Sequence, residues 1–266
     1  MGNNTSTTKK CNTPTILCFG SSLTAGYTVI SPYTKEFHPY SLSLMKKLKE
    51  LNHSCCSNLQ IISVGGNGVT AKEFATSKNS KSKDNVDVCG CHYSGLTRCL
   101  LEDNNVIGVI IMAGTNDIAN HEATPSSVFE SLRTLHEIAL QNGVEKTIAL
   151  SIPPNANTEL GCQMGHVHTE TCQTMLQTYT ACWKETNDLL EQWSNENETK
   201  TKYVNVADCV AFSKTSGNWE DDGLHMSEQG YDCLGEALAG VVGKHFLNLV
   251  DVLLDDGTRV AIRDAE

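Results

Sequence analysis

The chain has 266 residues, with 20 Lys and Arg against 31 Asp and Glu and a formal net charge of −11. No basic run is longer than two residues, which argues against nucleic acid as a partner. The longest apolar run, residues 106–113, is too short to span a bilayer. No Pro/Gly/Ser-rich linker divides the chain, so we expect one large domain with a sizeable core.

The first 14 residues are polar, and the apolar run that follows them has only the length of a strand. We therefore expect a disordered tail over residues 1–14, no signal peptide and a cytoplasmic location. In that compartment the 12 cysteines would be reduced thiols. Disulfides in an oxidising compartment are the alternative, and three pairs would suit them: Cys55 with Cys56, Cys89 with Cys91, and Cys162 with Cys172.

Residues 1–6, MGNNTS, fit the pattern for N-myristoylation, in which Gly2 becomes the acceptor once Met1 is removed. Lys9 and Lys10 would add the weak basic attraction that a single acyl chain needs for more than marginal membrane binding. The pattern fixes only three positions, so a plain disordered tail is the alternative. The segment thus predicts either such a tail or peripheral membrane association through an acylated Gly2.

The first apolar run, residues 15–19, stops at Gly20 and gives way to small hydroxyl residues, which predicts a buried strand and a tight turn. Ser22 lies in this turn. The carboxyl end of a first strand is where an open α/β sheet forms its ligand crevice, so Ser22 is a candidate nucleophile. Taken alone, a serine here is more often an ordinary turn residue. The nucleophile hypothesis requires a histidine base and donors for an oxyanion elsewhere in the chain.

Four further apolar runs of strand length follow, at residues 59–64, 106–112, 146–152 and 201–207. Stretches with helical spacing of apolar residues alternate with them, at residues 40–51, 124–142, after Cys172, and 227–247. This alternation predicts a parallel sheet with helices on both faces. Thr124 and Pro125 are typical of a helix start. The remaining segments are expected to be loops over 28–39 and 75–92, an insertion over 155–172, and an extension over 248–266 after a domain of residues 15–247.

His225 and Asp222 are the candidates for the base and its orienting acid. His225 could take the proton of the Ser22 hydroxyl and later give it to the leaving alcohol, as in any serine triad. Asp222 lies three residues earlier, near enough in a turn to bond the other ring nitrogen. Two alternatives stay open, because Asp222 could cap the last helix and Asp221 could orient the histidine in its place.

Gly68 and Asn116 are the candidates for holding a tetrahedral oxyanion, together with the N–H of Ser22. Gly68 would donate its main-chain N–H and Asn116 its side-chain amide. Each also has an ordinary interpretation, since a glycine can serve a positive φ and an asparagine can cap a turn. We expect the neighbouring Asp117 to be a structural hydrogen-bonding residue rather than part of a triad.

Four segments in chain order resemble the sequence blocks of the SGNH, or GDSL-type, hydrolases: residues 20–27 (GSSLTAGY), 65–70 (GGNGVT), 114–117 (GTND) and 222–225 (DGLH). The resemblance implies a flavodoxin-like three-layer α/β/α sandwich and esterase or lipase chemistry without a metal. It also implies that the residues that give the family its name are Ser22, Gly68, Asn116 and His225. Ser21 stands where the family name has Asp, ahead of the nucleophile, and we expect activity to survive this difference.

Residues 162–172 hold two cysteines and two histidines, the ligand set of a structural zinc site. Their spacing matches no common zinc finger, although Cys89, Cys91 and His92 could complete such a site from another loop. An insertion loop with incidental thiols is the simpler interpretation. We therefore predict no metal and no cofactor.

These residues together predict a serine esterase that cleaves a small-molecule carboxylic ester through an acyl-enzyme on Ser22. The acyl chain would be small or medium, and carbohydrate acetyl groups and lysolipids both stay open. Two alternatives use the same fold. One is a non-catalytic member that binds an ester, lipid or protein partner, and the other is an acyltransferase in which an alcohol replaces water as acceptor.

Overall fold

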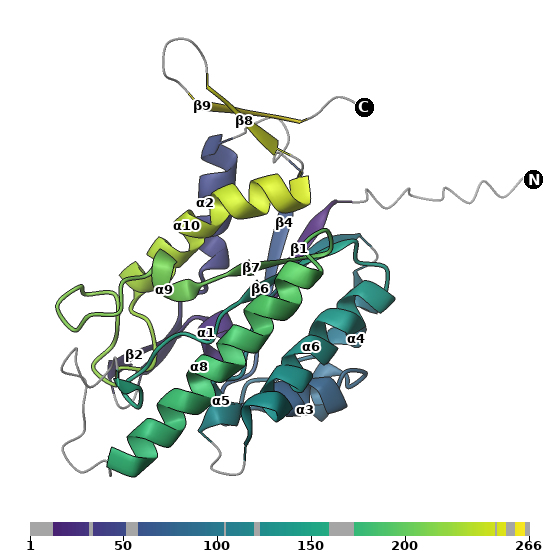
Figure 1. Ribbon diagram of the computed structural model, residues 1–266. Coiled ribbons are helices and arrows are strands. Elements are labelled where there is room, and N and C mark those ends of the chain that lie inside the picture. Colours follow the sequence, from purple (N-terminus) through teal and green to yellow (C-terminus); the bar gives the residue numbers. More distant parts are fainter. Residues whose placement is uncertain are drawn as a thin grey trace, which may run out of the picture.

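The computed structural model describes residues 13–31, 34–51, 58–103, 105–119, 123–159, 173–247, 249–253 and 259–263. Its centre is a sheet of five parallel strands in the order β4-β1-β5-β6-β7 (Figure 1). These strands are β1 Thr15–Gly20, β4 Gln60–Gly65, β5 Val106–Met112, β6 Lys146–Leu150 and β7 Thr201–Val204. The predicted five-stranded parallel sheet is confirmed, and each strand overlaps one of the predicted apolar runs.

The central strands are apolar on both faces because helices cover both faces of the sheet. In β5, Ile110 and Met112 belong to one core cluster, whereas Val109 and Ile111 belong to the other. The helices on the side of Ile110 are α2 Ser41–Leu51 and α10 Glu228–Leu247. Those on the side of Val109 are α3 Ala71–Thr76, α4 Leu96–Glu102, α6 Pro125–Gln141 and α8 Gln173–Glu196. This is the predicted three-layer α/β/α sandwich (Figure 1).

Helix α6 begins where the sequence predicts. Thr124 caps the helix by accepting a hydrogen bond from the Ser127 N–H, and the Ser127 hydroxyl accepts one from the Thr124 N–H in return. Pro125 occupies the first turn, where its missing N–H leaves no helical bond unmade. The helix ends at Gln141, directly before the predicted stop.

Helices α2 and α10 lie against each other on one face of the sheet. A Cβ at Gly235 of α10 would overlap the Ser43 hydroxyl and the Tyr40 carbonyl oxygen, so glycine permits this close approach. The Tyr231 hydroxyl of α10 also donates a hydrogen bond of 3.0 Å to the Tyr27 carbonyl oxygen. The last helix of the sandwich is thereby fixed to the segment that follows the first strand.

The predicted loop over residues 28–39 is wrong in part, because it contains an antiparallel hairpin. Its strands are β2 Tyr27–Ser31 and β3 Thr34–Phe37, and the rings of Tyr27 and Phe37 lie opposite each other with centroids 6.0 Å apart. Both strands are short and rich in polar residues, so no clear alternation marks them in the sequence.

Two other segments carry more regular structure than expected. Residues 75–92 are mainly loop, but they include the end of α3 and the 3₁₀ turn η1 Ser82–Asp84. Residues 248–266 include an antiparallel pair of strands, β8 Leu249–Leu253 and β9 Arg259–Arg263.

Three single-turn helices carry no signal in the sequence pattern. They are α1 Ser22–Ala25, α5 Thr115–Ile118 and α9 Val206–Cys209. Each comes within three residues after a strand of the sheet, and four residues are too few to show a helical period. Because α9 begins at Val206, the strand expected over residues 201–207 ends earlier than predicted.

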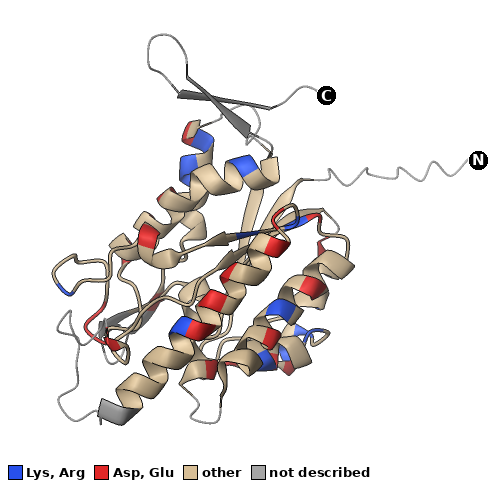
Figure 2. Cartoon of the chain, viewed as in Figure 1, with Lys and Arg blue, Asp and Glu red and all other residues tan. Residues whose placement is uncertain are grey.

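Acidic side chains lie along the outer face of α8, where Glu185, Asp188 and Glu191 are exposed (Figure 2). In the described part of the chain, the Lys and Arg residues of the same view are spread over several helices. A nucleic acid would meet a repulsive surface on this helix. Among the residues that the structure describes, no helix has both the length and the apolar character to cross a bilayer.

Some predictions concern residues outside the described ranges. They involve the amino-terminal tail with Gly2, Lys9 and Lys10, the pair Cys55 and Cys56, and the Cys/His segment over residues 162–172. The tail boundary, the domain of residues 15–247 and the extension stay predictions.

Candidate active site

The turn that carries Ser22 is fixed to the neighbouring strand β5. The Ser21 N–H and the Thr24 hydroxyl each donate a hydrogen bond of 3.2 Å to the Met112 carbonyl oxygen at the end of β5. A Cβ at Gly20 would overlap this same oxygen, so the close approach requires glycine. Ser22 then opens α1 with only 9 % of its surface exposed. The position of the candidate nucleophile is therefore set by the ends of two adjacent strands.

Ser22, His225 and Asp222 form a continuous chain of hydrogen bonds. The His225 Nε2 lies 3.0 Å from the Ser22 Oγ, and the His225 Nδ1 lies 2.7 Å from the Asp222 Oδ2. The other oxygen of Asp222 accepts the N–H groups of Leu224 and His225 at 2.8 and 2.9 Å. Asp222, and not Asp221, is the carboxylate that meets the imidazole.

A tight loop holds the imidazole in place. The Glu220 N–H donates to the His225 carbonyl oxygen at 2.9 Å, and Trp219 and Met226 pair across the loop as an isolated bridge. Gly223 has a φ of 59° at its tip, a conformation that favours glycine. The loop precedes α10, so a packed helix anchors the candidate base.

Tyr27 is a contact of the base that sequence reasoning missed. Its ring lies beside the imidazole of His225, with centroids 4.7 Å apart. The hydrogen bond from Tyr231 to the Tyr27 carbonyl oxygen fixes the main chain of this residue. Tyr27 therefore supports one side of the imidazole, and only its place in the first resembling block could have pointed to it.

Two opposing effects act on the pKa of Asp222. Burial raises the pKa, but the hydrogen bonds from the side chain and main chain of His225 outweigh burial, so the pKa lies below its usual value. The carboxylate is then charged at neutral pH and can stabilise an imidazolium. Burial and the nearby Asp222 raise the pKa of Glu220, so the acidic groups of this loop differ in proton affinity.

Asp222→Asn is expected to lower kcat by about 10⁴-fold, because an amide cannot hold the imidazole in the required tautomer.

The hydrogen bonds that lower the pKa of Asp222 also stabilise the folded state. That contribution is complete above about pH 4 and is lost as the pH falls through the lowered pKa. Thermal unfolding of both proteins from neutral to acid pH should therefore show a difference in Tm that closes at acid pH. A difference in Tm that does not change with pH would contradict the assignment of Asp222 as the carboxylate bonded to His225.

Gly68 and Asn116 follow the two strands that flank β1. The Gly66 N–H donates to the Gly20 carbonyl oxygen at 3.0 Å, which places the loop after β4 beside the turn of Ser22. Gly68 has a φ of 75°, and the Asn116 Nδ2 donates to the Val69 carbonyl oxygen at 2.9 Å. An amide nitrogen carries two hydrogens, and within the described residues this is the bond that it makes. Both candidates for the oxyanion thus lie at the same sheet edge as Ser22.

Asp117 caps a helix, in keeping with its expected structural role. The residue is buried, and its carboxylate accepts the N–H groups of Ala71 and Lys72 at 2.7 and 3.1 Å, at the start of α3. Burial raises the pKa of Asp117, and these main-chain bonds act against that shift. Asn116 and Asp117 together hold the segment that follows Gly68.

The start of the predicted insertion lies against the loop of His225. The Ala156 N–H donates to the Gly223 carbonyl oxygen at 2.8 Å. Asn155 is buried, and its Nδ2 donates to the Tyr179 hydroxyl of α8 at 2.6 Å. This segment therefore borders the candidate base from the side of α8.

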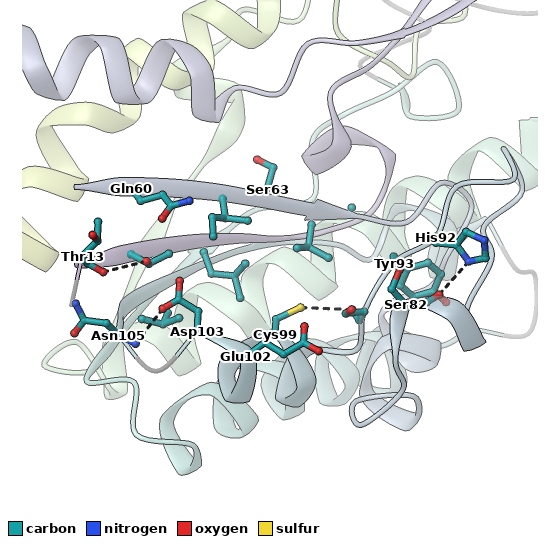
Figure 3. Close-up of a pocket in the computed structure, with 17 residues that line it drawn as sticks. Thr13, Gln60, Ser63, Ser82, His92, Tyr93, Cys99, Glu102, Asp103 and Asn105 are labelled. Carbon is teal, nitrogen blue, oxygen red and sulfur yellow. Dashed lines mark hydrogen bonds between the residues drawn. The ribbon is translucent and has the colours of Figure 1, made fainter. Parts of the chain in front are cut away.

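A separate cavity of about 690 Å³ lies along β4 and β1 beside α4. Figure 3 shows Gln60, Asn105 and Asp103 toward one end and His92 and Tyr93 toward the other. No candidate site residue lines it. Within the described ranges, no group of three or more His, Cys, Asp or Glu side chains could hold a metal ion.

An open α/β sandwich with a serine, a histidine and a carboxylate in hydrogen-bonded sequence is the arrangement of a serine hydrolase. The family model described as GDSL-like lipase/acylhydrolase matches residues 18–233. The chain belongs to this family and is a carboxylic ester hydrolase. No curated protein sequence matches the chain.

Solved structures share the fold at low identity. A carbohydrate acetylesterase from Sinorhizobium meliloti is 22 % identical, with a TM-score of 0.61, over 88 % of this chain and 100 % of that one. The inhibitor-bound aryl esterase of M. smegmatis is 21 % identical, with a TM-score of 0.60, over 86 % and 98 %. A GDSL-like lipase from Bacteroides thetaiotaomicron is 16 % identical, with a TM-score of 0.54, over 86 % and 88 %.

Proposed function

We propose that the protein hydrolyses a carboxylic ester through an acyl-enzyme on Ser22. The observation that carries the proposal is the distance of 3.0 Å between the Ser22 Oγ and the His225 Nε2, with Asp222 bonded to the other ring nitrogen. A serine hydroxyl becomes a strong nucleophile only with a base at this distance.

In the first half of the reaction, the Ser22 Oγ attacks the ester carbonyl carbon while its proton passes to the His225 Nε2. The carbonyl oxygen becomes an oxyanion, which the N–H groups of Ser22 and Gly68 and the Asn116 amide would hold. Asp222 stabilises the imidazolium. The C–O bond to the alcohol then breaks, the alcohol leaves with the proton from Nε2, and the acyl group stays on Ser22.

In the second half, water takes the place of the alcohol. His225 removes one proton from the water, whose oxygen attacks the acyl carbon and forms a second oxyanion at the same donors. The bond to the Ser22 Oγ breaks, and Nε2 returns its proton to that oxygen. The products are the carboxylic acid and the free serine hydroxyl.

The substrate would carry a small or medium acyl chain, as in a carbohydrate acetyl ester or a lysolipid. Val88 supports an apolar subsite, because the residue is 78 % exposed and its side chain lies so near Gly68 that a Cβ placed there would overlap it. Apolar surface beside an oxyanion donor suits the hydrocarbon part of an ester. Structures with the same fold include a carbohydrate acetylesterase and an aryl esterase.

Hydrolysis of p-nitrophenyl esters from acetyl upward tests the proposal. We expect the rate of hydrolysis to fall beyond a preferred acyl-chain length. That preferred length distinguishes acetyl esters from lipids as substrates. Preference for the shortest ester would favour acetyl groups, and preference for longer chains would favour lipids. The proposed activity would be contradicted if the protein hydrolysed no p-nitrophenyl ester and, in a parallel assay, no natural acetylated sugar or lysolipid.

A cytoplasmic location with an acylated Gly2 is a further part of the proposal, and it rests on residues 1–6 and the two lysines after them. Gly2→Ala is expected to shift the protein from the membrane fraction to the soluble fraction of a myristoylating cell, since the acyl chain would be lost. An unchanged distribution would favour the plain tail. Mass spectrometry of the amino-terminal peptide provides the control.

A further inference from the structure

We propose that Asp87 is a positioning residue for the oxyanion donor Gly68. The inference rests on the proposed function, in which Gly68 donates its N–H to the oxyanion. Asp87 lies in the predicted loop over residues 75–92, away from every segment that resembles the family blocks. Its carboxylate nevertheless meets the residue next to Gly68.

The carboxylate of Asp87 accepts four hydrogen bonds, and the residue is only 7 % exposed. Its Oδ2 accepts the main-chain N–H of Asn67 at 2.8 Å and the side-chain Nδ2 of Asn67 at 2.6 Å. Its Oδ1 accepts the N–H groups of Cys89 and Cys91 at 2.9 and 2.8 Å. One side chain thus joins the loop of Gly68 to the loop over residues 86–92.

The loop over residues 86–92 is itself well held. The Asp87 N–H donates to the Cys91 carbonyl oxygen at 2.9 Å, and Val86 and His92 pair as a bridge at its base. The Val88 N–H donates to the Asn67 carbonyl oxygen at 3.2 Å, so both main-chain groups of Asn67 are used. This loop can therefore act as a fixed support for the peptide that leads into Gly68.

Gly68 needs such a support because its donor is a single N–H in a turn. Its φ of 75° is open to few residues other than glycine, and glycine restricts its own backbone least. The Gly68 N–H shares its peptide plane with the Asn67 carbonyl group, which accepts the Val88 N–H. The peptide before it carries the Asn67 N–H, which donates to Asp87. Catalytic donors must keep their direction during the reaction, since a misplacement of about 1 Å can cost about 10²-fold in rate.

Only a carboxylate satisfies the four donors around Asp87. An asparagine has one accepting oxygen, so its NH₂ group would face either the N–H groups of Asn67 or those of Cys89 and Cys91. Burial raises the pKa of Asp87, but the bonds from Asn67, Cys91 and Cys89 outweigh burial and keep the pKa below its usual value. The group is therefore charged at neutral pH.

Asp87→Asn is expected to lower kcat for an oxygen ester by about 10²-fold, with KM changed much less. The second readout is a thionoester with the same acyl and alcohol groups. Its sulfur accepts hydrogen bonds weakly, so its hydrolysis depends less on the oxyanion donors. The ratio of the ester rate to the thionoester rate should therefore fall in the variant, whereas general damage to the fold would lower both rates equally.

Asp103→Asn is the matched control. Asp103 also accepts a main-chain N–H two residues ahead, that of Asn105 at 3.1 Å, but it precedes β5 at the opposite edge of the sheet. Asp103→Asn should leave the ester rate and the thionoester rate unchanged. If Asp87→Asn fails to fold, Asn67→Ala replaces it, because that change removes only the 2.6 Å bond and should lower the rate ratio to a smaller extent.

Ser22→Ala in the same assay separates the two hypotheses. If Ser22→Ala is inactive and Asp87→Asn keeps the wild-type rate ratio, the positioning role is wrong and the proposed function stands. If Ser22→Ala keeps full turnover, the proposed function fails, and the inference about Asp87 fails with it. Loss of both rates to the same extent in folded Asp87→Asn would assign Asp87 a purely structural role.

Discussion

Ser22→Ala is expected to lower kcat for ester hydrolysis on the order of 10⁶-fold, because serine triads lose about this much when the nucleophile is removed. The change deletes one oxygen, which forms the 3.0 Å hydrogen bond to the His225 Nε2. No acyl-enzyme can form without it. Any remaining hydrolysis would come from water held near the oxyanion donors. Turnover of a p-nitrophenyl ester and mass spectrometry after brief exposure to the ester measure both effects.

Ser21→Ala provides the matched control for this experiment. Ser21 is the adjacent serine, it is also buried, and its side chain makes no capping hydrogen bond to α1. We expect it to keep most of the wild-type activity. Full turnover by folded Ser22→Ala would exclude Ser22 as the nucleophile. An acyl adduct on another residue would point to where the reaction occurs instead.

His225→Ala is expected to cause a loss of similar size, on the order of 10⁶-fold in kcat. The serine would have no acceptor for its proton, and the leaving alcohol would have no donor. The missing ring leaves space between Ser22, Asp222 and Tyr27, three groups that contact it in the wild type. Added imidazole should therefore restore part of the activity in a concentration-dependent way.

His245→Ala is the control for the loss of a histidine. His245 lies in the last turn of α10, and its Nε2 contacts the Thr147 carbonyl oxygen at 3.1 Å. This variant should hydrolyse esters as the wild type does, and imidazole should not change its rate. Equal losses in both variants would show that the assay reports stability rather than the role of His225.

Much of the fold could be predicted because its strands are buried on both faces. An apolar run such as residues 106–112 is visible without knowledge of its neighbours. The hairpin of β2 and β3 could not be predicted in this way. Its strands are short and its pairing depends on cross-strand contacts such as that of Tyr27 with Phe37. The single-turn helices α1 and α5 depend on the strand ends they follow, which the chain forms only when folded.

The sequence likewise predicts only part of the candidate site. Ser22, Asp222 and His225 were found from residue type, spacing and family resemblance, and the structure brings these three together. Asp87 carries no such signal, and for Tyr27 only its place in the first resembling block could have pointed to it. An aspartate in a polar loop is ordinary in the sequence, and only the folded chain shows that four N–H groups converge on it.

The hydrogen bond between Ser22 and His225 joins residues 203 positions apart. All the remaining strands of the central sheet lie between them in the chain, and the loop of His225 is anchored by α10, which packs against α2. A chain still emerging from the ribosome would therefore hydrolyse no ester until almost the whole sandwich had assembled. The rate of ester hydrolysis per molecule would then report the fraction of fully folded chains in a preparation. Helix content would not report it, because helices can persist in species that have never formed this contact.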